Sequence, residues 1–243
     1  MLCFSIGKRY RGKTTAAYSL MRRVPSRIIF DPRHDFDLTG AQIAAGSVAT
    51  RSELDALFAG EYHDLVVRPR HGMDEQVQAL CKGLQPYADA RFQFGLLLDE
   101  ARLYKRTLGE PNSPFDDLIR HGSKNLIIVL TTHAVVDIHP DVRRIGDLWC
   151  IFQTTHQVDL KTIYDRIGDD GIVEQIRTLK SREFISWDDG QGVARVHKDP
   201  ATWAVPGLKT QSLDVGTPLH VLPAGQPGSR RALFDEEEVG EDL

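Results

Sequence analysis

The sequence predicts an α/β fold in which helices cover both faces of a mostly parallel central sheet. Strand-like and helix-like segments alternate along most of the 243 residues. A glycine-rich turn of the pattern G-x-x-x-x-G-K-T follows the first apolar run and precedes a helical pattern. A second apolar run, at residues 94–98, ends in two acidic residues. Both patterns place polar groups at the carboxyl ends of buried strands, where α/β sheets bind their ligands.

The amino-terminal half of the chain supplies the first strands of this sheet. Its predicted elements, in chain order, are a strand at residues 2–6, a helix at 14–22, strands at 27–30 and 64–67, a helix at 76–84 and a strand at 94–98. The strands are short, continuous apolar runs, which are typical of strands buried on both faces.

The carboxyl-terminal half continues the alternation and then changes pattern. A helix is expected between Ser113 and Gly122, because serine is a favoured N-cap, Pro114 suits the first turn and glycine often follows the last turn. Residues 126–130 predict a buried strand whose polar tip is Thr131-Thr132-His133. The remaining predicted elements are a strand at 149–153, a helix at 159–167 and a β-hairpin with strands at 184–187 and 193–196.

The chain is expected to form one domain followed by a tail. Residues 1–205 contain the alternating elements, and a hydrophobic content of 41% suffices for one large core. Residues 206–243 are rich in proline and glycine and then acidic, so we expect an extended or disordered tail. No apolar stretch approaches the roughly 20 residues that cross a bilayer. We therefore expect a cytoplasmic protein without a transmembrane segment.

The charge distribution and the cysteines indicate which partners and which redox compartment to expect. The formal net charge is −4, but six of the 34 acidic residues lie in residues 235–243. The rest of the chain carries 28 acidic and 30 basic residues, so a polyanionic partner is not excluded. Cys3, Cys81 and Cys150 lack metal-ligand spacing and lie in apolar surroundings, which predicts buried free thiols in a reducing compartment.

The glycine-rich turn at residues 7–14 has the pattern and the strand–turn–helix context of a phosphate-binding P-loop. Its backbone amides and the start of the helix would bind the phosphates of ATP. Lys13 would reach the β- and γ-phosphates, and the Thr14 hydroxyl would bind Mg²⁺. Bulky side chains in this turn must point outward. The residues expected to contact the nucleotide are Gly7, Lys8, Arg9, Tyr10, Arg11, Gly12, Lys13, Thr14 and Thr15.

The two acids after residues 94–98 form a Walker B pattern. Asp99 would hold the Mg²⁺ shell, and Glu100 would orient and polarise the attacking water. The second acid favours a hydrolase over a small-molecule kinase, because a kinase must keep water away from the γ-phosphate. The sequence therefore predicts an Mg²⁺-dependent ATP hydrolase.

Several motifs together resemble the FtsK–HerA superfamily of DNA-pumping ATPases. They are Asp31-Pro32 after the second strand, the acids Asp99-Glu100, Arg120-His121-Gly122-Ser123-Lys124 before the strand that ends in Thr131-Thr132-His133, and His139-Pro140-Asp141-Val142-Arg143. The short chain looks most like the genome-packaging ATPases of double-stranded DNA viruses with an internal membrane. The likeness covers about residues 1–200. The family usually has glutamine where this chain has Thr132-His133, and its phosphate loop is usually less bulky.

The resemblance implies an ASCE-type P-loop ATPase that forms a homo-oligomeric ring, commonly a hexamer, and moves double-stranded DNA into a viral capsid. Each nucleotide would lie between neighbouring subunits, and a cation from the adjacent subunit would neutralise charge on the γ-phosphate. Arg120 is the first candidate for that cation, followed by Lys124 and Arg143. Thr132 or His133 would sense the γ-phosphate. Further implied partners are capsid or vertex proteins, and the implied location is the host cytoplasm or the virion.

Two other functions share parts of this motif set. A phage-assembly or export ATPase usually continues into a membrane anchor. A partition-type nucleotide switch places a second lysine where this chain has Lys8, five residues before Lys13. The paired glycines of that class are missing here. Stimulation of hydrolysis by duplex DNA would favour the motor, and nucleotide-dependent dimerisation without strong turnover would favour the switch.

Overall fold

The computed structural model describes residues 1–22, 24–36, 38–88, 92–122 and 125–202. Lys124 and the tail predicted at residues 206–243 lie outside the described residues. Among the described helices, none combines the length and the apolar character needed to cross a membrane.

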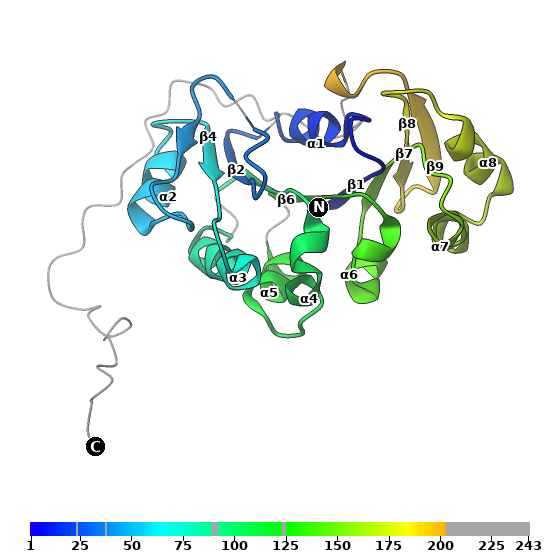
Figure 1. Ribbon diagram of the computed structural model, residues 1–243. Coiled ribbons are helices and arrows are strands. Elements are labelled where there is room, and N and C mark those ends of the chain that lie inside the picture. Colours follow the sequence, from blue (N-terminus) through cyan, green and yellow to red (C-terminus); the bar gives the residue numbers. More distant parts are fainter. Residues whose placement is uncertain (23, 37, 89–91, 123–124, 203–243) are drawn as a thin grey trace, which may run out of the picture. The chain divides into compact units, whose positions relative to one another are not determined.

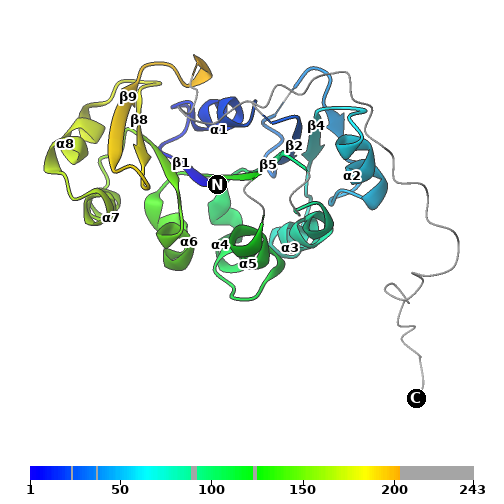
Figure 2. The ribbon, with the colours of Figure 1, turned by 180° about the vertical axis from the view of Figure 1, so that it is seen from behind.

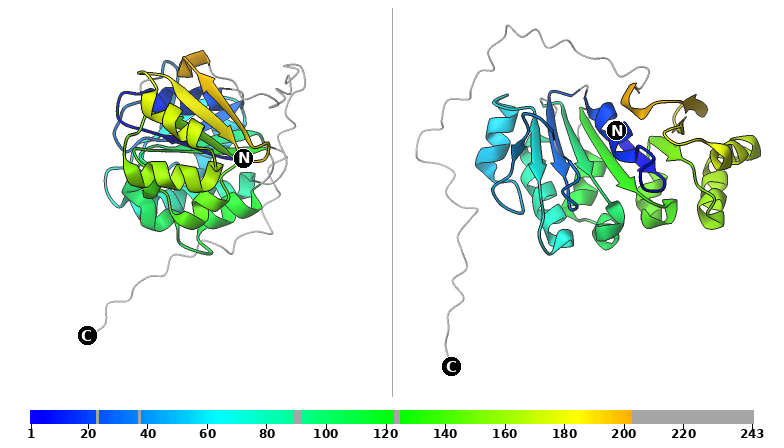
Figure 3. Two further views of the ribbon diagram at one scale, coloured as in Figure 1. Left: turned by 90° about the vertical axis from the view of Figure 1, so that its right-hand side faces the viewer. Right: turned by 45° about the horizontal axis from the view of Figure 1, so that its top comes forward.

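Within the described residues, the strands form one nine-stranded sheet (Figure 1). In spatial order they are β3 (Gln42–Ile43), β4 (Asp64–Val67), β2 (Ser26–Phe30), β5 (Phe94–Leu98), β6 (Leu126–Thr132), β1 (Leu2–Ile6), β7 (Leu148–Phe152), β8 (Phe184–Asp188) and β9 (Val193–His197). Strands β1 to β7 pair in parallel, whereas β8 and β9 pair antiparallel as a hairpin. The right-hand view of Figure 3 shows the strands side by side. The predicted fold class, with its terminal hairpin, is confirmed.

Helices cover both faces of the sheet, as predicted. The helices are α1 (Lys13–Met21), α2 (Arg51–Phe58), α3 (Met73–Leu84), α4 (Lys105–Leu108), α5 (Pro114–His121), α6 (Pro140–Arg144), α7 (Gln157–Ile167) and α8 (Asp170–Thr178). Helix α1 packs on β1, β5, β6 and β7, and α3, α5 and α6 lie on the opposite face (Figures 1 and 2). The predicted caps of α5 are confirmed, because Ser113 accepts a hydrogen bond from the amide of Asp116 and the helix ends at Gly122.

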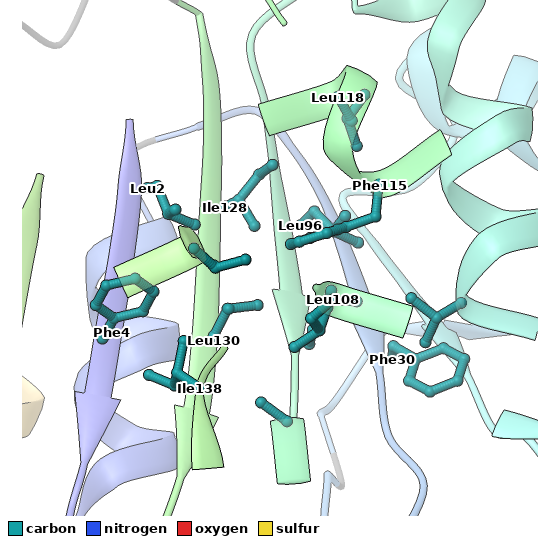
Figure 4. Packing of buried hydrophobic residues seen from close by; sticks show 14 of the residues in the cluster. Leu2, Phe4, Phe30, Leu96, Leu108, Phe115, Leu118, Ile128, Leu130 and Ile138 are labelled. Carbon is teal, nitrogen blue, oxygen red and sulfur yellow. The ribbon is translucent and has the colours of Figure 1, made fainter. Parts of the chain in front are cut away.

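The core has two layers because successive side chains of each strand point to opposite faces. Leu2 and Phe4 of β1 pack on the face covered by α5, together with Ile128 and Leu130 of β6 (Figure 4). Cys3 of β1 points to the other face, where it joins the apolar side of α1. The central strands are therefore buried on both sides, which explains their continuous apolar sequences.

Candidate active site

The candidate site lies where β1, β5 and β6 end. Strand β6 lies between β1 and β5, so the turn after β1 and the acids after β5 flank the tip of β6. These segments enclose a cavity of about 560 Å³. The residues that line it are Arg9, Tyr10, Gly12, Lys13, Thr14, Thr15, Arg33, Asp35, Asp99, Glu100, His133, Ser181 and Arg182. The structure thus brings the two predicted motifs to one cavity.

Two glycines allow the turn after β1 to close over the start of α1. The Gly7 amide donates to the carbonyl of Thr132, 3.1 Å away, which fixes the turn to β6. Gly12 caps α1 with φ +100°, a backbone conformation that favours glycine. A Cβ on Gly12 would also lie 2.7 Å from Cγ of Pro200. Tyr10 points outward with 95% of its surface exposed, as the sequence predicted for bulky residues in this turn.

Lys13 is buried and lines the cavity. Its ammonium donates to the carbonyl of Lys8 at 3.2 Å and lies 3.4 Å from Nδ1 of His133. Burial lowers the pKa of Lys13, and the nearby carboxylates of Glu100 and Asp99 partly oppose this effect. An incoming polyphosphate would supply the negative charge that favours the protonated amine.

Thr14 and Asp99 form an oxygen-rich pair beside Lys13. The Thr14 hydroxyl lies 3.5 Å from Oδ1 of Asp99, which also accepts a hydrogen bond from the Thr131 hydroxyl. Asp99 is 3% exposed, and burial raises its pKa to about 6, with the neighbouring charge of Glu100 adding to the shift. A cation would offset this buried charge, and hard oxygen donors suit Mg²⁺.

The protein ligands alone would not complete a metal shell. In the ranges that the structure describes, no group of three or more His, Cys, Asp or Glu residues has metal-binding geometry. This arrangement fits Mg²⁺, which usually keeps several waters and binds through one or two protein groups plus substrate phosphates.

Glu100 lies among three basic side chains, those of His133, Arg33 and Arg102. Its backbone is left-handed, with φ 55°, and its amide donates to the Thr131 hydroxyl at 3.1 Å. Its carboxylate lies 2.9 Å from Nε2 of His133, 3.3 Å from Nε of Arg33 and 3.2 Å from Nε of Arg102. Because the carboxylate is buried, the charges of these neighbours affect its ability to accept a proton from a water molecule.

His133 bridges Lys13 and Glu100. Burial lowers the pKa of His133, and the adjacent positive charge of Lys13 lowers it further. The neutral imidazole can then accept from Lys13 through Nδ1, while its Nε2 faces the carboxylate of Glu100. Thr132, in contrast, is fully buried and donates to Asp137, and the cavity lining does not include it. Of the two predicted sensor residues, the structure brings His133 to the cavity.

Two of the three predicted trans-acting cations, Arg120 and Arg143, lie away from this cavity, and the third, Lys124, is outside the described residues. Arg120, in the last turn of α5, pairs with Asp116 in the first turn. Helix α5 packs near Leu2 and Leu126, which lie at the start of β1 and β6. Arg143 is partly buried near Asp159, and burial lowers its pKa. Arg120 and Arg143 are thus absent from the cavity lining of their own chain. A role toward a neighbouring subunit stays a prediction.

Four cavity residues that come from loops were not predicted from the sequence: Arg33, Asp35, Ser181 and Arg182. Arg33 follows β2, and Arg182 precedes β8, where it pairs with Asp199 at 2.9 Å. The Asp31-Pro32 motif pointed to the first of these loops without assigning a role to Arg33. No local pattern marked Arg182, because it reaches the cavity only through the packing of the hairpin.

Comparisons with known proteins place this fold in context. No protein-family model matches the chain, and no curated protein matches it. Among solved structures, the genome packaging NTPase B204 from Sulfolobus turreted icosahedral virus 2, in complex with AMPPCP, matches with 21% identity and a TM-score of 0.62. The match covers 82% of this chain and 97% of that chain.

Two further solved structures have the same arrangement. B204 from Sulfolobus turreted icosahedral virus, described as its DNA-packaging ATPase, matches with 22% identity and a TM-score of 0.57, over 82% of this chain and 97% of that chain. VirB4 of Thermoanaerobacter pseudethanolicus matches with 13% identity and a TM-score of 0.56, over 84% of this chain and 90% of that chain. The chain therefore has a P-loop NTPase fold. Its resemblance to the viral genome-packaging ATPases is confirmed at the level of the fold.

Proposed function

We propose that this protein is an Mg²⁺-dependent ATPase that moves double-stranded DNA, and that it packages a viral genome into a capsid. The observation that carries the enzymatic part is the single cavity that joins Lys13, the Thr14–Asp99 pair and Glu100. A nucleotide-binding turn, a site for the metal and a candidate general base are the parts that ATP hydrolysis requires.

Each of these residues has a distinct role in the proposed reaction. Lys13 and the amides of the turn bind the β- and γ-phosphates, and Thr14 and Asp99 hold the metal. Bound Mg²⁺ supplies neutralisation of charge that develops on the phosphates. Glu100 orients the attacking water, and the neutral imidazole of His133 restrains that carboxylate. Loss of Lys13 should therefore affect nucleotide binding, whereas loss of Glu100 should affect turnover.

The coupling to DNA is the finer part of the proposal. Support comes from the fold shared with proteins described as genome-packaging and DNA-packaging ATPases. A homo-oligomeric ring would place a cation, for which Arg120, Lys124 and Arg143 are candidates, at the nucleotide of the next subunit. Contacts to DNA would be mainly to phosphates and therefore weakened by salt. If the protein packages DNA in an infected cell, it would act in the host cytoplasm, near capsid or vertex proteins.

The test is ATPase activity of the full chain, with and without duplex DNA, together with its native mass. Duplex DNA should raise turnover several-fold, and the mass should be that of a ring. Lys13→Ala should not bind nucleotide. Glu100→Gln should bind ATP with near-normal affinity. Its turnover should fall by at least about 100-fold, because it lacks the general base.

Three outcomes would count against parts of this proposal. Tight nucleotide binding by Lys13→Ala would show that the turn does not act as a phosphate site. Near-normal turnover by Glu100→Gln would remove that carboxylate from the mechanism. Nucleotide-dependent dimerisation with weak turnover, and no response to DNA, would favour the partition-type switch.

A further inference from the structure

We propose that Arg33 binds the γ-phosphate of the nucleotide within its own chain, and that Glu100 holds the guanidinium in place until the nucleotide arrives. This inference rests on the proposed ATPase function. It assigns Arg33 as the residue that lets the site distinguish a triphosphate from a diphosphate.

Arg33 lies in the candidate site, in contact with Glu100. Arg33 lines the same cavity as Asp99, Glu100 and His133. Its Nε lies 3.3 Å from Oε1 of Glu100. Because Glu100 is the candidate water-orienting residue, a guanidinium that both contacts it and lines the cavity would lie near the phosphate that water attacks.

The charges that line the cavity support the same placement. Lys13 and Arg33 both line it, as do the acidic residues Asp99 and Glu100. Two cations therefore face one region of the cavity, and the carboxylates of Asp99 and Glu100 offset them in the absence of a ligand. A terminal phosphate offers a guanidinium two oxygens in a planar, bidentate geometry, as a carboxylate does, but with greater negative charge. Exchange of Glu100 for phosphate is thus favourable for Arg33.

Hydrogen bonds to the carboxylate of Asp31 fix the loop that contains Arg33. Asp31 is fully buried, and its carboxylate accepts hydrogen bonds from the amides of Asp35 at 3.0 Å and Phe36 at 3.1 Å. The guanidinium of Arg68 lies 3.8 Å from the same carboxylate. These bonds set the direction in which the loop presents Arg33, so binding phosphate would require little ordering of the backbone.

Arg102 provides a matched comparison within the same molecule. It is also an arginine in contact with Glu100, with Nε 3.2 Å from Oε2. Its side chain is 40% exposed, against 24% for Arg33, and it is not part of the cavity lining. Loss of either arginine removes one positive charge from Glu100, but only loss of Arg33 removes a cation from the cavity wall.

The experiment compares the affinities of AMPPCP and ADP, each with Mg²⁺, for the wild type, Arg33→Gln and Arg102→Gln. The wild type should prefer AMPPCP. Arg33→Gln should bind ADP nearly as well as the wild type but lose at least about tenfold in that preference, equivalent to about 1.4 kcal/mol. Arg102→Gln should retain the preference. Retained ADP binding also shows that Arg33→Gln is folded.

The possible contradictions are distinguishable. If the wild type binds neither nucleotide, the proposed function itself fails. If the wild type prefers AMPPCP and Arg33→Gln keeps that preference, the assignment of Arg33 fails while the proposed function stands. Equal affinity of the wild type for the two nucleotides, or an equal loss of preference in Arg102→Gln, would also overturn the assignment.

Discussion

At the scale of single residues, Gly12 lies where the phosphate-binding turn packs against Pro200. We predict that Gly12→Ala destabilises the fold by about 1–3 kcal/mol and weakens nucleotide binding, because φ is +100° there and the added methyl would meet Pro200. Urea unfolding and titration with a fluorescent ATP analogue measure the two effects.

Gly60→Ala is the matched control for Gly12→Ala. Gly60 also has a positive φ, +83°, but a Cβ there would meet nothing within 4 Å. The control should lose only the stability that follows from backbone strain, and it should keep its nucleotide affinity. Equal nucleotide affinity in the two variants would show that the turn tolerates a side chain at Gly12.

The residues of the site differ in how well the sequence predicts them. Lys13 and Asp99 belong to local patterns, because the phosphate-binding turn and the end of a buried strand each require particular residue types in a short segment. Arg33 and Arg182 were not predicted, because only the folded sheet brings their loops beside the turn. The strand tip was ambiguous in the sequence: Thr132 turns to Asp137, and His133 turns to the cavity.

At the scale of secondary structure elements, the hairpin of β8 and β9 contains a histidine that links stability to pH. His197 lies 2.8 Å, through Nε2, from the hydroxyl of Ser186, and its ring stacks on Phe184 at 4.6 Å. Burial lowers the pKa of His197 from its usual 6.5, and the charge of Arg195 adds to the shift. The folded state therefore favours the neutral ring.

The sign of the pH effect follows from that shift. A lowered pKa in the folded state gives stability that is fully present above pH 6.5 and is lost as the pH falls through the folded-state pKa. We predict that the thermal midpoint falls between pH 7.5 and pH 5.5, and that His197→Gln falls by less over the same range. Parallel decreases in the two proteins would remove His197 as a source of this dependence.

Elements with a strong local signal were predicted, and elements without one were missed. Strands such as β1 and β6 are continuous apolar runs, and α5 has favourable residues at both ends. Strand β3 has two exposed residues and no such run. Helix α2 was also missed, although Thr50 and Glu53 form a capping box at its start that the sequence displays.

At the scale of the whole molecule, the order of the strands determines the site. Because β6 lies between β1 and β5, the Walker motifs are separated by one strand, and the tip of that strand supplies Thr131 and His133 between them. The alternation of elements predicted a parallel sheet with helices on both faces. It could not give the strand order, which depends on contacts between segments far apart in the sequence.

The most direct test of the central claim is a crystal structure of the full chain with Mg²⁺ and AMPPCP. We expect the triphosphate to lie in the cavity beside Lys13, with the metal between the phosphates and the oxygens of Thr14 and Asp99. A well-defined nucleotide bound elsewhere, with this cavity empty, would contradict the account.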